Sequence, residues 1–156
     1  MVRIEERIRE AVKFFWETRS GQATRQGNTS GLKDQGERSA VTGGAQMDGF
    51  VLLVRDLLIE SGVPASSIFT NTKLEIPGFY RPEKKWDLLV VSDGNLLASI
   101  EFKSQIGPSF GNNYNNRTEE ALGNATDLLT AYREGVFKLS NRPWFEVTPI
   151  FWTVAK

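Results

Sequence analysis

Two carboxylates and a lysine lie at the ends of two adjacent apolar segments of the chain. Asp87 opens the run D-L-L-V-V-S, and Glu101 and Lys103 end the run N-L-L-A-S-I-E-F-K. Because side chains alternate along a strand, we expect Glu101 and Lys103 on one face and Phe102 on the other, in the core. Charged groups on an apolar hairpin are costly to desolvate unless a cation or an anionic ligand compensates them. The pattern therefore predicts a ligand site.

The composition restricts the chemistry of this site. The chain of 156 residues contains no histidine and no cysteine, which excludes Ser-His and Cys-His catalytic groups, histidine or thiolate zinc sites and disulfides. Mg²⁺ binds through a few carboxylate oxygens together with water and a phosphate. Asp87 and Glu101 therefore predict a magnesium site with Lys103 beside it, suited to metal-assisted phosphodiester hydrolysis. A solvated strand end is the alternative interpretation of the same three residues.

The turn of the hairpin must satisfy a parity condition. Asp93-Gly94 is a typical turn signal between two strands. If Asp87 pairs with Glu101, three residues remain in the loop, whereas a two-residue loop in continuous register would put these carboxylates on opposite faces. We therefore predict a three-residue or bulged turn, with Gly94 or Asn95 at positive φ.

The segments before the hairpin predict two helices joined by a long loop. Residues 2–18 carry apolar side chains at helical spacing. Residues 19–46 contain six glycines and few apolar residues, which is typical of a flexible linker or of an arm that folds on nucleic acid or a partner subunit. Residues 47–61 are apolar on most faces and predict a buried helix ending at Gly62. The apolar positions of the first helix are Ile4, Ile8, Ala11, Val12 and Phe15.

Two further acids are candidate accessory residues. Asp48 falls in the first turn of the predicted helix over 47–61, where the helix dipole favours a carboxylate. A capping role therefore explains this residue at least as well as a metal-linked role. Glu75 falls in a short predicted strand over 73–76. It is a candidate ligand of a second metal ion, or simply an exposed strand residue.

Basic and polar residues flank the hairpin. Lys84 and Lys85 precede Asp87 and are suited to contact phosphates or to protect a sheet edge from pairing. A predicted loop follows the hairpin, and its residues are suited to base recognition or to turn geometry alone. The net charge of zero does not by itself indicate a nucleic-acid partner. The candidate recognition residues of the loop are Asn112, Asn113, Asn115, Asn116 and Arg117.

The whole pattern predicts an α/β fold with a central mixed sheet flanked by helices. A helix over 118–137 and a strand over 145–155 complete the order helix, strand, hairpin, helix, strand. With 40% hydrophobic and 24% charged residues, the chain is typical of one globular domain, here residues 1–156 with a catalytic core over 47–156. No apolar run has the length of a membrane span or the form of a signal peptide, so we predict a cytoplasmic protein without a membrane partner.

These residues resemble a known family. W-D at 86–87 and E-F-K at 101–103, in this order of elements, resemble the PD-(D/E)xK nuclease core. The longer stretch I-E-F-K-S-Q-I-G-P-S-F-G-N-N-Y-N-N-R-T-E-E-A-L-G-N-A, together with Q-M-D-G-F, resembles the XhoI-type restriction endonucleases. The resemblance implies a Mg²⁺-dependent, homodimeric type II restriction endonuclease that cuts double-stranded DNA at the palindrome CTCGAG.

The resemblance also assigns roles to residues. It implies that Asp87, Glu101 and the backbone carbonyl of Phe102 bind the metal and that Lys103 lies beside the attacking water. Trp86 stands where the family signature has a proline. The chain is shorter than members of the family, so we expect it to lack their C-terminal part. A catalytically inactive DNA-binding or structural module with the same fold is the alternative function.

Overall fold

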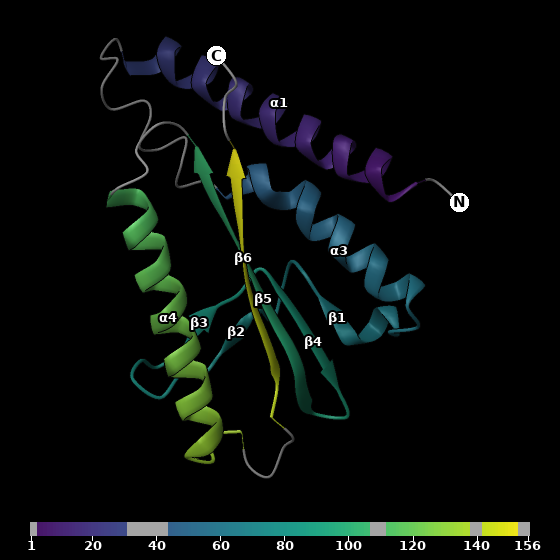
Figure 1. Cartoon of the computed structure of the whole chain (residues 1–156), viewed down its shortest axis with the longest axis vertical. Coiled ribbons are helices and arrows are strands. Elements are labelled where there is room, and N and C mark those ends of the chain that lie inside the picture. The colour runs from purple at the N-terminus through teal and green to yellow at the C-terminus, as the bar shows by residue number, and fades with distance from the viewer. Residues whose placement is uncertain (1–2, 31–43, 107–111, 138–141, 153–156) are drawn as a thin grey trace. The chain divides into compact units, whose positions relative to one another are not determined.

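The computed structural model describes residues 3–30, 44–106, 112–137 and 142–152. The chain divides into two compact units, Met1–Leu57 and Leu58–Lys156. Helices form the first unit, and a mixed β-sheet with a long helix forms the second (Figure 1). Among the helices of the described ranges, none combines the length and apolar character that a membrane span requires.

The first unit contains α1 (Ile4–Ser30), the 3₁₀ turn η1 (Ala45–Met47) and most of α3 (Asp48–Glu60). Both predicted helices are present, but α1 continues to Ser30, through the first part of the segment predicted to be irregular. Extending an existing helix costs far less than nucleating one, so a polar segment that contains glycine can continue it. The rest of the predicted arm, residues 31–43, lies outside the described residues.

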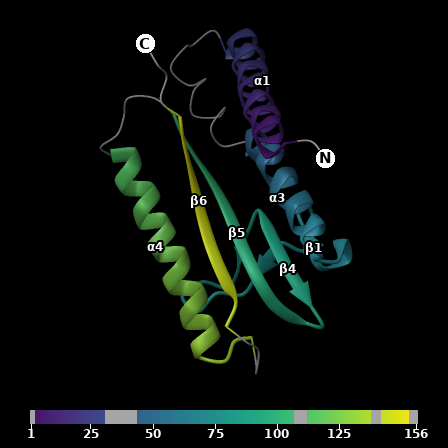
Figure 2. The same cartoon turned by 45° about the vertical axis from the view of Figure 1, so that its right-hand side comes forward.

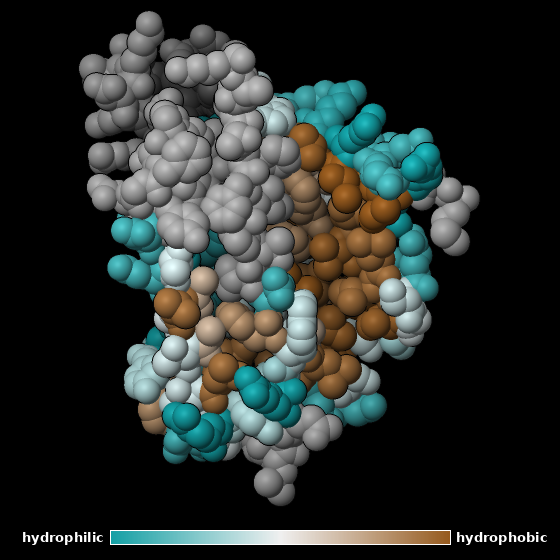
Figure 3. Space-filling model, viewed as in Figure 1, coloured by the Kyte–Doolittle hydropathy of each residue, from teal (hydrophilic) through white to brown (hydrophobic). Residues whose placement is uncertain are grey.

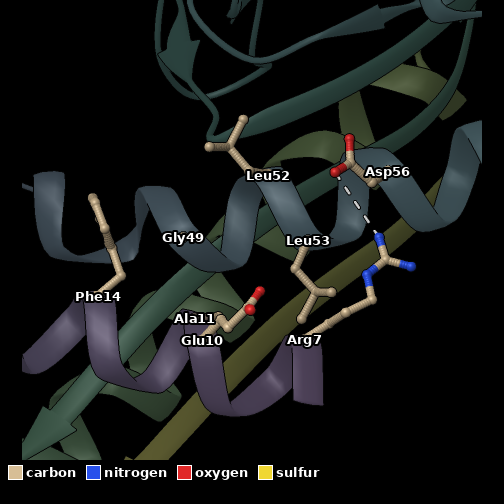
Figure 4. Close-up of a pocket in the computed structure, with 8 residues that line it drawn as sticks. All are labelled: Arg7, Glu10, Ala11, Phe14, Gly49, Leu52, Leu53 and Asp56. Atoms are coloured by element: carbon tan, nitrogen blue, oxygen red, sulfur yellow. Dashed lines mark ion pairs between the residues drawn. The ribbon is translucent and has the colours of Figure 1, made fainter. Parts of the chain in front are cut away.

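Helices α1 and α3 pack against each other in antiparallel orientation. Gly49 of α3 faces Ala11 and Phe14 of α1 so closely that a Cβ there would lie 3.1 Å from the Phe14 ring. Arg7 and Asp56 pair at 3.9 Å near the other end of the contact. Figure 4 shows the small pocket lined by these helices, with this ion pair drawn as a dashed line. None of the predicted site residues lines it.

The buried faces of these two helices are smaller than the sequence suggests. In α1, Ala11 and Phe15 are buried as predicted, whereas Ile4 and Ile8 are more than 40% exposed. In α3, predicted to be a buried helix, only the two residues Phe50 and Val51 are buried. Figure 3 shows such hydrophobic side chains, in brown, at the molecular surface.

The second unit is built on a four-stranded sheet with the order β1-β4-β5-β6. The β1–β4 and β4–β5 pairs are antiparallel, and β5 and β6 run parallel because α4 crosses between them (Figures 1 and 2). The mixed sheet and its helix confirm the predicted α/β class. The elements are β1 (Ile68–Phe69), β4 (Leu88–Ser92), β5 (Asn95–Ile106), α4 (Asn112–Arg133) and β6 (Trp144–Trp152).

The first strand of the main sheet is not the one that the sequence predicts. The predicted strand over 73–76 is reduced to β2 (Glu75–Ile76), which pairs with β3 (Lys84–Lys85) in a separate two-stranded sheet. The edge of the main sheet is instead β1, paired with β4. A strand of two residues carries too little periodicity to be read from a sequence.

The hairpin places Asp87 across from Glu101, as the parity condition requires, but it does so without a three-residue loop. Its turn is a tight two-residue turn in which Asp93 (φ 51°) and Gly94 (φ 77°) both have positive φ, as a type I′ turn requires. The register then shifts by one residue between Val90 and Val91, where Leu97 of β5 has no partner on β4. This bulge returns the later pairs to the register that was predicted.

The core of the second unit lies between α4 and the sheet. Trp86 packs edge-on against Phe145 of β6, with ring centroids 5.5 Å apart. Phe102, on the other face of β5, is buried as predicted. The buried residues of the cluster beneath α4 are Leu74, Trp86, Leu89, Leu96 and Leu128.

Candidate active site

The hairpin places Asp87 and Glu101 side by side on the face of the sheet that α4 covers. Leu88 pairs with Ile100, and the Asp87 N–H donates to the Ile100 carbonyl at 3.3 Å, so Asp87 lies across from Glu101. The Asp87 carboxylate accepts a hydrogen bond of 2.7 Å from the Phe102 N–H. The strand that presents one carboxylate therefore also orients the other.

Glu101 is the most heavily contacted group of the site. It is 5% exposed, and its Oε1 accepts from Lys103 Nζ and from Lys84 Nζ, each at 2.8 Å. Its Oε2 accepts from the Asn124 amide at 2.6 Å. The structure thus brings Glu101 and Lys103 together as predicted and adds two residues, Lys84 and Asn124, that the sequence did not assign to this carboxylate.

The two carboxylates have opposite pKa shifts. Burial raises the pKa of Asp87, partly opposed by the hydrogen bond from the Phe102 N–H, and the neighbouring Glu101 charge raises it further. Burial also acts against ionised Glu101, but hydrogen bonds from Lys103 and Lys84 outweigh it and hold the pKa of Glu101 below its ordinary value. Glu101 is thus the carboxylate whose ionised form the protein stabilises.

Lys84 is part of the site, whereas the sequence suggested a phosphate contact or edge protection. Its side chain is 11% exposed, and its ammonium lies 4.7 Å from the centroid of the Trp86 ring. Lys85, the next residue, is exposed and lies opposite Glu75 in the small sheet. Strand alternation separates the two lysines, so that one enters the site and the other faces solvent.

Helix α4 supplies buried polar residues that the sequence analysis missed. Asn124 is 6% exposed and Asp127 is 3% exposed, and they lie one helical turn apart. The apolar residues at helical spacing predict a different buried face, and of these Leu128 is buried whereas Leu122 is 63% exposed. These residues are Leu122, Ala125, Leu128, Leu129 and Tyr132. The available signal was the spacing of Asn124, Asp127 and Leu128, which places two polar residues beside one apolar residue on a single face.

Asp127 fixes the segment that leads into the site. Its Oδ1 accepts from the N–H groups of Phe79 (2.9 Å) and Tyr80 (2.7 Å), and its Oδ2 pairs with Arg81 Nε at 3.1 Å. A Cβ at Gly78 would collide with Asp127 and Arg81. The loop before β3, and with it the start of the strand that carries Lys84, is therefore tied to α4.

The predicted recognition loop is partly helical. Residues 107–111 lie outside the described residues, but α4 begins at Asn112, six residues before its predicted start. Asn115 and Asn116 are exposed on its first turns, and the side chains of Asn112 and Asn113 lie outside the described part. Arg117 pairs with Glu120 at 2.7 Å, an i,i+3 contact that stabilises this end of the helix.

In the described part of the chain, no group of three acids that could hold a metal ion includes either accessory candidate. Glu75 is exposed in β2, in agreement with the simpler interpretation of that residue. Asp48 is the first residue of α3, in the other compact unit, and partial burial raises its pKa.

The donor set suits a hard divalent cation that keeps part of its water shell. Asp87 and Glu101 offer carboxylate oxygens, and the backbone between Glu101 and Lys103 offers the Phe102 carbonyl. Across the described ranges, no group of three or more Asp, Glu, His or Cys side chains is placed to share a metal ion. Mg²⁺ commonly binds through one or two carboxylates, with water and substrate phosphate completing its octahedron, so the residues present fit it.

Comparison with known proteins identifies close sequence relatives. The family model described as restriction endonuclease XhoI matches residues 25–151. The chain is 50% identical to the type II restriction enzyme AbrI of Azospirillum brasilense over 90% of this chain and 63% of that protein. It is 52% identical to BstVI of Geobacillus stearothermophilus over 72% and 52%, and 45% identical to XhoI of Xanthomonas vasicola over 80% and 50%.

The chain thus spans between half and two thirds of the length of these relatives, all of which are named as type II restriction enzymes. No solved structure matches the chain.

Proposed function

Since the chain belongs to the XhoI restriction endonuclease family, we propose that it carries the catalytic core of a type II restriction endonuclease. The substrate is double-stranded DNA, cut at the palindrome CTCGAG, and the cellular location is the cytoplasm. The observation that supports this best is the buried Glu101 carboxylate, which faces Asp87 and contacts Lys103 at 2.8 Å.

Each residue of the site has a role in this proposal. Asp87, Glu101 and the Phe102 carbonyl would hold Mg²⁺, which would neutralise the scissile phosphate and stabilise the negative charge that develops on it. Lys103 holds Glu101 and orients the attacking water, and its ammonium stabilises charge at the reacting phosphorus centre. Asn124 keeps the second oxygen of Glu101 in a fixed direction.

A plasmid carrying one CTCGAG site tests the proposal. We expect cleavage with Mg²⁺, none with EDTA, and none by the Asp87→Ala variant, because that substitution removes a metal ligand. A plasmid with one base pair of the site changed is the control for specificity. Cleavage that survives EDTA or Asp87→Ala would contradict the mechanism, and binding to CTCGAG without cleavage would favour the inactive DNA-binding module.

Lys103→Ala separates catalysis from binding. We expect the cleavage rate to fall on the order of 10²–10³-fold, as for the loss of one preorganised charge at a reacting centre. DNA affinity, measured by fluorescence anisotropy with Ca²⁺ in place of Mg²⁺, should change little, because Lys103 is mostly buried against Glu101. Lys13→Ala, which removes an exposed lysine of α1, is the matched control. An equal loss of affinity and rate in Lys103→Ala would make it a phosphate contact instead.

A further inference from the structure

The site contains one lysine more than the proposed mechanism uses. Lys84 and Lys103 both donate to the same oxygen, Oε1 of Glu101, at 2.8 Å each. The two ammonium groups match the two carboxylates of Asp87 and Glu101 in number, and Lys103 also pairs with Glu120 at 3.6 Å. Such compensation is what a largely buried pair of carboxylates requires.

Lys84 and Lys103 come from different elements. Lys103 is on β5, two residues from Glu101, whereas Lys84 is on the two-residue strand β3 and pairs through its backbone with Ile76. The Lys84 ammonium also lies within 3.3 Å of the Lys85 carbonyl and over the face of Trp86. It therefore has other favourable partners close by, and it can leave Glu101 without any change in β5.

A metal ion on Glu101 would compete with these ammonium groups. We propose that the Lys84 ammonium holds Oε1 of Glu101 in the metal-free site. When Mg²⁺ occupies that oxygen, the ammonium would leave it and pair with the DNA phosphate at the site. This inference rests on the proposed nuclease function. It assigns Lys84 to the exchange of cations on Glu101 and leaves the orientation of the water to Lys103.

The exchange predicts opposite effects on metal affinity and on turnover. In Lys84→Gln, Mg²⁺ no longer competes with a second ammonium for Glu101. We therefore expect the affinity of the DNA-free protein for Mg²⁺ to rise about tenfold, which corresponds to the free energy of one charge-assisted hydrogen bond. The cleavage rate at saturating Mg²⁺ should fall about tenfold, because the phosphate loses a cation. Calorimetric titration with MgCl₂ and single-turnover cleavage of CTCGAG DNA measure the two quantities.

Three variants make the test specific. Lys84→Met keeps the aliphatic chain against Trp86 without the charge and should behave like Lys84→Gln, so the test survives if one of them folds poorly. Lys84→Arg restores the charge and should return the Mg²⁺ affinity toward the wild-type value. Lys13→Gln removes an exposed lysine of α1, outside the site, and should change neither quantity.

The outcomes separate this inference from the proposed function. If the wild-type protein cleaves DNA but both neutral Lys84 variants bind Mg²⁺ more weakly or as the wild type does, Lys84 is structural and the inference is wrong while the nuclease function stands. If the wild-type protein neither binds Mg²⁺ nor cleaves DNA, the proposed function fails and this inference fails with it.

Discussion

Asp87 and Glu101 have the same chemistry but different surroundings, and the difference divides their roles. Two ammonium groups and an amide contact Glu101, so they lower its pKa and fix the direction of its carboxylate. Among the described residues Asp87 has one hydrogen-bond donor, the Phe102 N–H, and burial raises its pKa. A pair of carboxylates with pKa values moved apart is typical of a functional site. Asp87 is therefore the carboxylate whose ionised form a bound cation would stabilise most.

Substitution of the two carboxylates should therefore have opposite effects on stability. Asp87→Asn removes a charge that burial disfavours and keeps an acceptor for the Phe102 N–H, so the free energy of unfolding at pH 7 should stay equal or rise. Glu101→Gln leaves Lys84 and Lys103 without their shared carboxylate and should lower it by about 3 kcal/mol. Urea denaturation measures both, and neither variant should cleave DNA. Equal destabilisation by the two substitutions would contradict this division.

The pH dependence follows from the same shifts. The pKa of Glu101 is lowered in the folded protein, so its contribution to stability is present above its pKa in the unfolded chain and is lost as pH falls through its folded value. The pKa of Asp87 is raised in the folded protein, so its contribution to stability is full at low pH. That contribution is lost as pH rises through the pKa of Asp87 in the folded protein. The difference in unfolding free energy between Glu101→Gln and the wild type should therefore shrink on acidification.

Asn124 is predicted to act through Glu101 rather than on the substrate. Asn124→Ala removes the donor to Oε2, so the cleavage rate should fall about tenfold, the equivalent of one hydrogen bond to a charged group, with DNA affinity unchanged. Asn124→Asp places a second carboxylate against Glu101 and should move the acidic limb of the pH–rate profile to higher pH. Thr126→Ala, an exposed position of the same helix, is the control. A pH profile that is the same in Asn124→Asp and the wild type would contradict the role.

At the scale of elements, the sequence predicts the hairpin and its functional face well. Alternation along β5 was sufficient to place Glu101 and Lys103 together and Phe102 in the core. The parity argument correctly required an irregularity, yet it could not locate the bulge at Leu97, which is 44% exposed and carries no sequence signal. Two-residue strands such as β1 depend on tertiary pairing, and no local pattern predicts them.

Helix α4 shows why the apolar pattern alone does not find Asn124 and Asp127. Its buried face carries Asn124 and Asp127 because each meets a partner distant in sequence, Glu101 in one case and the loop at Phe79 and Tyr80 in the other. A rule that assigns apolar residues to the core places Leu128 correctly but also assigns Leu122 to the core, where it does not lie. Disagreement between hydrophobic pattern and burial is expected where function requires polar groups inside.

The loop that Asp127 holds should depend on it strongly. Asp127→Ala leaves the Phe79 and Tyr80 N–H groups and Arg81 without their shared acceptor, so we expect a loss of about 3 kcal/mol in the free energy of unfolding, measured with urea. Because the same loop precedes Lys84, cleavage should fall as well. Glu134→Ala is the matched control, since Glu134 is an exposed acid just beyond α4 that pairs only with the exposed Arg133 among the described residues. A stability of Asp127→Ala close to that of Glu134→Ala would show that the loop is held by other contacts.

At the scale of the whole molecule, the net charge of zero and the twofold symmetry of a palindromic DNA site limit how the protein would bind DNA. The net charge is zero, so under the proposed function attraction to DNA would come from local basic groups and from a cation bound at the site. The described residues contain one set of Asp87, Glu101 and Lys103, which under the proposed function would cut one strand at a time. Cutting both strands of a palindrome then requires two copies of the chain related by the twofold axis of the DNA site.

A supercoiled plasmid with one CTCGAG site distinguishes one acting copy from two. If the protein acts as a homodimer, linear DNA should form with little nicked intermediate, and the rate should rise steeply with protein concentration around the dimer dissociation constant, because only the dimer places a site on each strand. A mixture of wild type with excess Asp87→Ala should convert the product from linear to nicked DNA, since mixed dimers hold one competent site. If the wild-type protein gives only nicked DNA at every concentration, dimeric cleavage by this chain is contradicted. Each copy of the chain would then cut a strand on its own.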